Sequence, residues 1–265
     1  MNQKRLNFRF APALIAAFVL TFLPGPCDKL HAEGALVKAL IPYVQQNFTK
    51  ALELLEPLAA QGDAVAQLTL GRMYLRGEGV SRNSFAALQW HRKAADQGEI
   101  DAQFELGVMY RDGLGTGAHG HLALYWFKRA ADGGAPHALN AIGELYLDDR
   151  DIPQSFETAF EWFWIGAELG SAEAMYNIGM LYALGRGVVR DEIASFMWFD
   201  LAADFDPGRV HENAVRARTT LAERLTPSQV WAAKIRSRAW KHFHCCSPNI
   251  TNGLLGNGIA RARIE

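Results

Sequence analysis

The chain contains little cysteine. Only Cys27, Cys245 and Cys246 occur among 265 residues, and the last two are adjacent. Adjacent Cα atoms lie about 3.8 Å apart across a trans peptide, which is shorter than the usual span of a disulfide. The sequence therefore excludes a disulfide framework of the kind that holds many small secreted domains together.

The chain also lacks an excess of charge of either sign. Its 27 basic and 28 acidic residues give a formal net charge of -1, and its 49% hydrophobic and 21% charged residues are typical of a folded soluble protein. A near-neutral chain has no long-range field that would attract nucleic acid or anionic lipid. We therefore predict no nucleic-acid partner and expect any partner to be recognised by local surface chemistry.

No hydrophobic run reaches the length of about 20 residues that spans a bilayer comfortably. The apolar run at residues 10–23 follows a basic stretch and is closed by Pro24, which is typical of a secretory signal. We predict a targeting segment at residues 1–32, cleavage after Ala32, and a periplasmic or secreted protein. An uncleaved leader is the alternative, and it would be the chain's one contact with a membrane.

One pattern dominates what is present. A unit of 36 residues occurs four times without insertion, at 62–97, 98–133, 134–169 and 170–205. Chance does not hold five positions in phase over four units, and a fixed period of this length predicts an array of stacked units. The recurring positions are Ala66, Ala102, Ala138 and Ala174; Gly71, Gly107, Gly143 and Gly179; Tyr74, Tyr110, Tyr146 and Tyr182; Trp90, Trp126, Trp162 and Trp198; and Ala95, Ala131, Ala167 and Ala203.

Two stripes of apolar residues at helical spacing lie within each unit. Glycine-rich turns such as residues 77–79 separate the stripes and permit positive φ after a first helix. Asn83, Ser155 and Asp191 are good N-caps for the second helices, whereas His119 is a poorer one. The sequence predicts an all-α fold, a right-handed superhelical solenoid of antiparallel helix pairs.

The recurring glycine and tryptophan predict how the pairs pack. A glycine inside a helix costs about 1 kcal/mol relative to alanine, so we expect two helix backbones to approach closely at Gly71 and its counterparts. We expect Trp90 and its counterparts to fill the wedge between successive hairpins. A tryptophan buries about 150–250 Å², which at roughly 25 cal/mol per Å² makes this ladder a large part of the stability.

The ends of the array differ from its middle. Residues 33–61 are interpreted as a degenerate N-terminal repeat that caps the array, and residues 206–241 as two helices that seal its other end. Residues 242–265 carry no amphipathic pattern, and we predict disorder there.

The third unit has aspartates where the others have turn glycines. Asp149 and Asp151 take these positions, and Asp148 lies beside them. Aspartate tolerates the left-handed region better than most residues, so we expect the turn to survive. A calcium site is weighed here, but a solvated turn is favoured because further ligands are missing.

The repeat resembles a known family. The segments Ala66-Gln67-Leu68-Thr69-Leu70-Gly71-Arg72-Met73-Tyr74, Gly77-x-Gly79-Val80 and Trp90-x-x-Lys93-Ala94-Ala95 are similar to the Sel1-like repeat, a relative of the tetratricopeptide repeat. The entry to the array and the closing Leu225-Thr226-Pro227 segment resemble exported bacterial members. The resemblance implies a protein-binding scaffold.

Comparison of the four units separates positions fixed by the repeat from positions free to vary. The varying positions of the first helices lie three or four residues apart and so share one face. The resemblance implies that this helix lines the concave side, so we predict a groove there that binds a protein or peptide, with Phe104, Val108, Tyr176 and Met180 as exposed apolar anchors. The predicted partner-binding residues are Leu68, Arg72, Arg76, Phe104, Val108, Arg111, Asn140, Glu144, Tyr176 and Met180. The alternative for any one of them is packing against the adjacent hairpin.

Motifs of catalysis and metal binding are weak. Residues 115–120 match a dinucleotide fingerprint as a string but follow a helix rather than a strand. His211-Glu212 begins a zinc-protease pattern, but Val215 stands where the second histidine is needed. The cluster from His242 to Cys246 has metal-ligating side chains in a segment without a scaffold. We predict no metal, no cofactor and no catalytic residue.

These observations favour an exported scaffold that regulates or assembles an envelope process. The alternative is a periplasmic hydrolase, either β-lactamase-like or acting on the cell wall. No Ser-x-x-Lys occurs in the sequence, and the resemblance implies repeat disulfides for β-lactamase relatives that have no counterpart here. The chain is therefore predicted not to be an enzyme.

Overall fold

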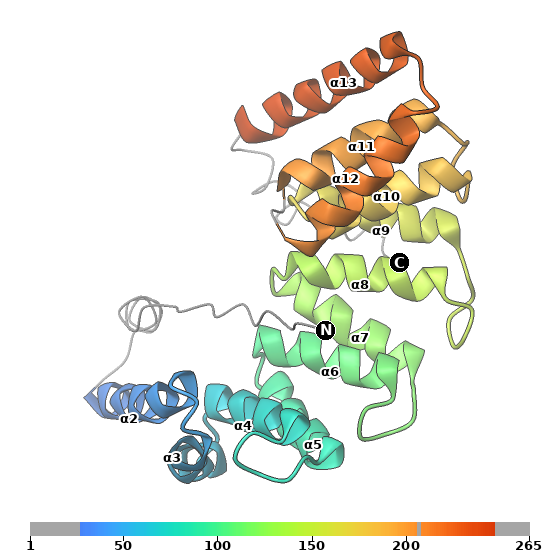
Figure 1. The fold of residues 1–265 in the computed structure, drawn as a ribbon. Coiled ribbons are helices and arrows are strands. Elements are labelled where there is room, and N and C mark those ends of the chain that lie inside the picture. Colours follow the sequence, from blue (N-terminus) through green and yellow to red (C-terminus); the bar gives the residue numbers. More distant parts are fainter. Residues whose placement is uncertain (1–26, 206–207, 247–265) are drawn as a thin grey trace, which may run out of the picture. The chain divides into compact units, whose positions relative to one another are not determined.

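A computed structural model describes residues 27–205 and 208–246, and over these residues the chain forms helices and no strands (Figure 1). The predicted all-α repeat fold is confirmed. Residues 1–26 of the predicted targeting segment and residues 247–265 of the predicted tail lie outside the described residues. The helices are α2 (Cys27–Val44), α3 (Phe48–Ala60), α4 (Ala64–Arg76), α5 (Ser84–Asp96), α6 (Ile100–Asp112), α7 (Gly120–Asp132), α8 (Pro136–Leu147), α9 (Phe156–Glu168), α10 (Ala172–Leu184), α11 (Glu192–Phe205), α12 (Arg209–Ala222) and α13 (Pro227–Cys246).

The helices fall into two compact units, Met1–Ala102 and Gln103–Glu265, whose boundary lies within α6. In unit 1, α3 packs against α2 and α4, and α4 packs against α5. Its core includes the fully buried Leu55, Leu70 and Met73. In unit 2, successive helices from α7 to α12 pack in order, and α13 packs on α11.

Local sequence sets where the hairpins begin and end. The side chains of Asn83, Ser155 and Asp191 accept amide hydrogen bonds at the starts of α5, α9 and α11, as predicted. His119 makes no such bond at the start of α7. Gly77 ends α4 in the left-handed conformation at φ 74°, which glycine adopts without steric cost. Capping residues and turn glycines in the local sequence therefore determine where these helices begin and end.

The recurring glycine of the first helix faces an aromatic ring rather than a second backbone. A Cβ on Gly143 would lie 2.4 Å from the Phe163 ring, and one on Gly179 would lie 2.8 Å from Phe199. A Cβ on Gly71 would lie 2.3 Å from the ring of His91. The prediction that two helix backbones approach each other at these glycines is wrong. The ring of the residue that follows each tryptophan packs against the glycine Cα instead.

The tryptophan ladder is confirmed. Trp126, Trp162 and Trp198 are 5%, 7% and 2% exposed, and Trp90 is half-buried against the core of α2 to α4. Trp198 of α11 makes edge contacts with Trp164 of α9 at 5.4 Å between ring centroids. The burial of these indoles removes a large apolar area from water.

The C-terminal end is sealed by helices, but α13 is longer than predicted. It continues past Lys241 to Cys246, into the segment predicted to be disordered. The ring of His244 stacks on Trp240 at 3.8 Å, and its Nδ1 lies 2.8 Å from the Trp240 carbonyl oxygen. These contacts between residues one turn apart hold the last turn of the helix.

Candidate protein-binding surface

Helix α4 carries three predicted partner-binding residues, and the structure separates them. Leu68 is only 3% exposed, so its prediction as a contact residue is wrong. Arg72 is half-buried and donates a hydrogen bond to Asp101 at 3.2 Å. Arg76 is exposed and forms an ion pair with Glu78 at 3.8 Å.

The predicted apolar anchors in unit 2 are half-buried rather than exposed. Phe104 of α6 lies 5.4 Å from the Phe127 ring and 4.2 Å edge-on from His137. Tyr176 of α10 lies 5.3 Å from the Phe199 ring. These rings pack on the second helix because it brings an aromatic side chain to the recurring glycine. A partner could therefore contact only one edge of each ring, because neither side chain protrudes from the surface.

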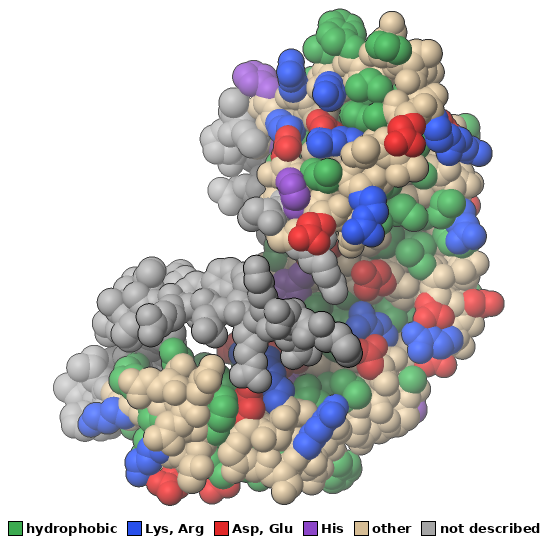
Figure 2. Space-filling model, in the orientation of Figure 1, with side chains coloured by type: hydrophobic (Ala, Val, Ile, Leu, Met, Phe, Trp, Pro, Cys, Tyr) green, Lys and Arg blue, Asp and Glu red, His purple; other side chains and the backbone are tan. Residues whose placement is uncertain are grey.

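A chain of polar contacts links the first helices of unit 2. Arg111 of α6 donates to Glu144 of α8 at 3.4 Å, and Asn140 donates to Glu144 at 2.9 Å. The side-chain amide of Asn177 in α10 donates to the side-chain oxygen Oδ1 of Asn140 at 2.9 Å. Figure 2 shows acidic and basic side chains side by side over α8. We call these four residues, Arg111, Glu144, Asn140 and Asn177, the polar ladder.

The polar ladder corrects one prediction and adds one residue. Asn140 is only 8% exposed, and its bond with Asn177 links α8 to α10. Its prediction as a residue that contacts a partner directly is therefore wrong. Asn177 was missed, although its position also varies between units, with Glu105 and Ala141 as counterparts. That variation was the available signal.

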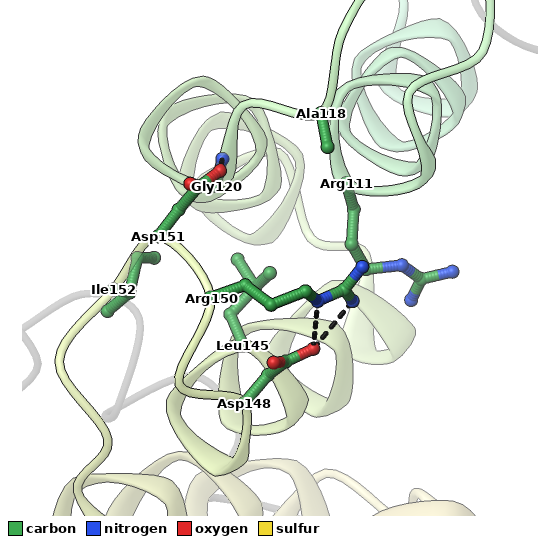
Figure 3. A pocket seen from close by; sticks show the side chains of 8 residues that line it. All are labelled: Arg111, Ala118, Gly120, Leu145, Asp148, Arg150, Asp151 and Ile152. Carbon is green, nitrogen blue, oxygen red and sulfur yellow. Dashed lines mark hydrogen bonds and ion pairs between the residues drawn. The ribbon is translucent and has the colours of Figure 1, made fainter.

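One small pocket of about 130 Å³ opens beside the ladder. Arg111 and Arg150 lie on one side of it and Asp151 and Ile152 on the other, above Leu145 (Figure 3). It is much smaller than the sites of about 300–1,000 Å³ that hold most small-molecule ligands. Its size suits one side chain of a partner.

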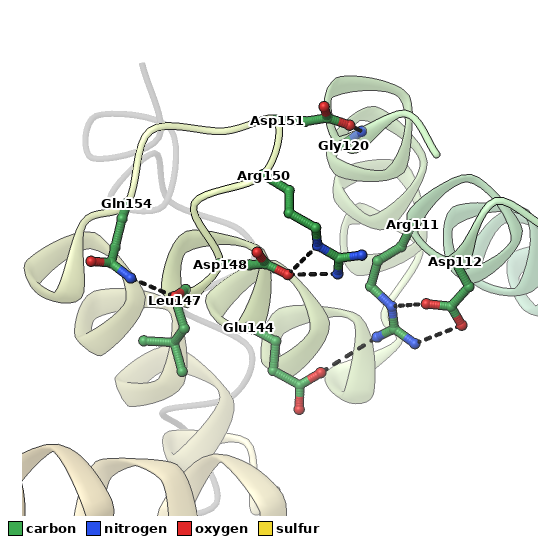
Figure 4. Close-up of polar contacts among 9 residues, drawn as sticks. All are labelled: Arg111, Asp112, Gly120, Glu144, Leu147, Asp148, Arg150, Asp151 and Gln154. Atoms are coloured by element: carbon green, nitrogen blue, oxygen red, sulfur yellow. Dashed lines mark hydrogen bonds and ion pairs between the residues drawn. The ribbon is translucent and has the colours of Figure 1, made fainter. Parts of the chain in front are cut away.

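Both guanidinium groups of the pocket are held by carboxylates (Figure 4). Hydrogen bonds to Asp112, at 2.8 and 3.2 Å, raise the pKa of Arg111. The Arg150 side chain donates to Asp148 at 2.6 Å, which lowers the pKa of Asp148. Both guanidinium groups are therefore already paired with carboxylates at the rim of the pocket.

The turn of the third unit supplies the pocket wall in an unexpected conformation. Among the described residues Gln46 alone has positive φ without being glycine, so the predicted left-handed aspartates are wrong. Asp148 is extended at ψ 136°, Gln154 donates to the Leu147 carbonyl oxygen at 2.7 Å, and Asp151 accepts from the Gly120 amide at 2.7 Å. The carboxylate of Asp151 is thus engaged as a helix cap, not as a calcium ligand.

In residues 27–205 and 208–246, no group of three or more His, Cys, Asp and Glu could hold a metal ion. The same part of the chain contains no helix long and apolar enough to cross a bilayer.

The repeat architecture defines the class of protein, and comparison with known proteins gives the family. The Sel1 repeat matches residues 39–63, 64–99, 100–134, 136–171 and 172–204. The chain belongs to the Sel1 repeat family, whose members are in general non-enzymatic scaffolds suited to protein–protein interaction. The first of the five matches, residues 39–63, overlaps the segment 33–61 that was predicted to be a degenerate repeat.

Solved bacterial structures agree with this assignment. A Sel1 repeat protein from Oxalobacter formigenes is 32% identical, with a TM-score of 0.56 over 70% of this chain and 54% of that one. The protein c5321, a protective antigen of uropathogenic Escherichia coli with an SLR fold, is 24% identical, with a TM-score of 0.60 over 80% of this chain and 53% of that one. The chain thus spans about half the length of both. No curated protein matches it.

Proposed function

We propose that this chain is an exported scaffold that binds a protein or peptide along the first helices of unit 2, in order to regulate or assemble an envelope process. The observation that carries the proposal is the mixed face of α6, α8 and α10. Half-buried apolar side chains at Phe104, Val108, Tyr176 and Met180 lie beside the polar ladder and its pocket. Interfaces combine such apolar contacts with satisfied polar ones.

The repeat itself supplies variants that test this face without unfolding the chain. Val108 and Met180 occupy the repeat position that holds Glu144 in the third unit and Arg72 in the first. That position already carries a charge elsewhere in the array, so we expect Val108→Glu and Met180→Glu to leave the chain folded. The unfolding temperature checks this, because Met180 packs against the buried cluster that contains Phe196 and Phe199. Each introduces a charge where a partner would bury an apolar side chain.

The experiment is crosslinking and affinity capture of the chain from its native envelope, with the recovered partners quantified. We expect Val108→Glu with Met180→Glu to reduce partner recovery at least tenfold at an unchanged unfolding temperature. Leu122→Glu, which alters an exposed apolar residue (42%) on the second helix α7, is the matched control and should recover partners normally. Equal partner recovery with the unchanged chain, the double variant and the Leu122→Glu control would overturn the proposed binding face.

Export is tested separately. We expect the chain to be recovered from the envelope fraction with a new amino terminus at Glu33, and a basic-to-acidic change of Arg5 to retain it in the cytoplasm. An unprocessed chain in the cytoplasm would contradict export and leave the binding face to be judged by the capture experiment. Nothing in the structure favours the hydrolase alternative.

A further inference from the structure

The last helix of the described chain carries charge of one sign. Helix α13 contains Lys234, Arg236, Arg238 and Lys241 and no aspartate or glutamate. This local excess of positive charge is hidden in the near-neutral total of the chain.

The inner face of α13 is fixed to unit 2. Ser237, fully buried, donates to Asp200 of α11 at 2.7 Å, and Lys241 pairs with Asp204. The Trp240 ring packs edge-on against Trp198 at 5.7 Å and Phe205 at 5.8 Å. The helix is therefore held in one orientation, and its opposite face is directed away from α11.

The outer face combines cations with large apolar side chains. Trp231 is 68% exposed and Ile235 is 42% exposed. Lys234 and Arg238 are exposed beside them, and neither forms an ion pair within the described residues. Residues 231, 235 and 238 are spaced four and three apart, so they lie along one line of the helix. Figure 2 shows basic and hydrophobic side chains together over α13.

We propose that this outer face of α13 binds the anionic surface of a phospholipid bilayer. A helix that presents tryptophan, isoleucine and exposed cations on one side matches the headgroup boundary, where aromatic rings partition and basic residues meet anionic lipid. A bilayer accepts protruding side chains without a shaped partner pocket, and negative headgroups complement a helix without acidic residues. The surface differs from the proposed partner-binding face of α6, α8 and α10.

The test is flotation of the full chain with vesicles of neutral phosphatidylcholine and with vesicles that contain about 30% phosphatidylglycerol. We expect binding to the anionic vesicles to exceed binding to the neutral ones at least tenfold and to weaken as salt screens the charges. Lys234→Glu with Arg238→Glu should abolish this difference, and Trp231→Ala should reduce binding to both vesicle types. Circular dichroism establishes that the variants fold.

The matched control is Arg92→Glu with Arg216→Glu, which changes the net charge equally at exposed residues of α5 and α12. It should bind anionic vesicles as the unchanged chain does. The proposal is overturned if the control loses binding as the α13 variant does, or if both vesicle types bind equally at low salt. It is also overturned if a single-stranded DNA oligonucleotide at the same phosphate concentration displaces the chain from the vesicles.

Discussion

The carboxylate of Asp151 accepts a 2.7 Å hydrogen bond from the Gly120 amide and so caps α7 from the following repeat. In the fourth unit the same turn position is Gly187, where a Cβ would lie 2.4 Å from the backbone of Phe156. In the third unit the glycine lies on the other side of this contact: aspartate stands in the turn, and glycine, in place of phenylalanine, stands at the start of the facing helix. The exchange makes room for a side chain that replaces the missing cap of His119.

Removal of this cap should destabilise the chain. We expect Asp151→Ala to lower the free energy of unfolding by about 1 kcal/mol, because the first amide of α7 loses its acceptor. Urea unfolding followed by circular dichroism measures the change. Asp149→Ala, at an exposed neighbour in the same turn, should have almost no effect. An equal loss in both variants would show that Asp151 does not act as a cap.

The exchange itself predicts coupling between the two positions. A Cβ on Gly120 would lie 2.7 Å from the Cβ of Asp151, so Gly120→Ala should cost about 1–3 kcal/mol through overpacking. In an Asp151→Gly background the clash is gone, and the same change should cost less by at least about 1 kcal/mol. A double-mutant cycle of urea midpoints measures this. Strict additivity of the two changes would contradict it.

Because an aromatic ring packs against each recurring glycine, replacing such a glycine with alanine should destabilise the chain, although alanine is the best helix former. Gly143→Ala places a methyl group 2.4 Å from the Phe163 ring, and we expect a net loss of about 1–3 kcal/mol despite the better helix propensity of alanine. Gly34→Ala in α2, where no atom lies within 4 Å, should be neutral or slightly stabilising. Thermal unfolding of both variants checks the contrast, which would vanish if the ring could move aside.

Asp200 should decide whether α13 stays on the array. It is 9% exposed and accepts hydrogen bonds from Arg218 at 2.6 Å and Ser237 at 2.7 Å. Asp200→Ala leaves both donors without this acceptor, and we expect a loss of about 2–3 kcal/mol. Hydrogen exchange should show α13 amides less protected while α4 amides are unchanged. Glu161→Ala, at an exposed position of α9, is the control.

Stability in alkali should depend on Tyr43. Burial raises its pKa, and the charge of Glu78, to which its hydroxyl donates at 3.1 Å, raises it further. The folded state holds this proton more tightly, so the contribution to stability is complete below pH of about 10 and is lost as the pH rises through the folded-state pKa. Tyr43→Phe should reduce the fall in unfolding free energy above that pH. Tyr125→Phe, at a 51% exposed ring, should retain the full fall.

The repeat predicted the secondary structure well because its signals are local. Helix caps such as Asn83 and turn glycines such as Gly77 act on amides and carbonyls a few residues away. The binding face was predicted less well. Leu68 and Asn140 vary between units as surface residues do, yet both are buried, because neighbouring variable residues can compensate for one another inside a stack.

The sequence by itself determined that the chain is an array of helical hairpins, since period, caps and turns are properties of near neighbours along the chain. Only the tertiary structure decided what fills the space beside each glycine, which aspartate caps α7, and which side of α13 faces outward. Those outcomes depend on residues of different helices and turns, such as Gly143 and Phe163 within one hairpin or Asp151 and Gly120 in successive ones. These residues meet only after the helices have packed.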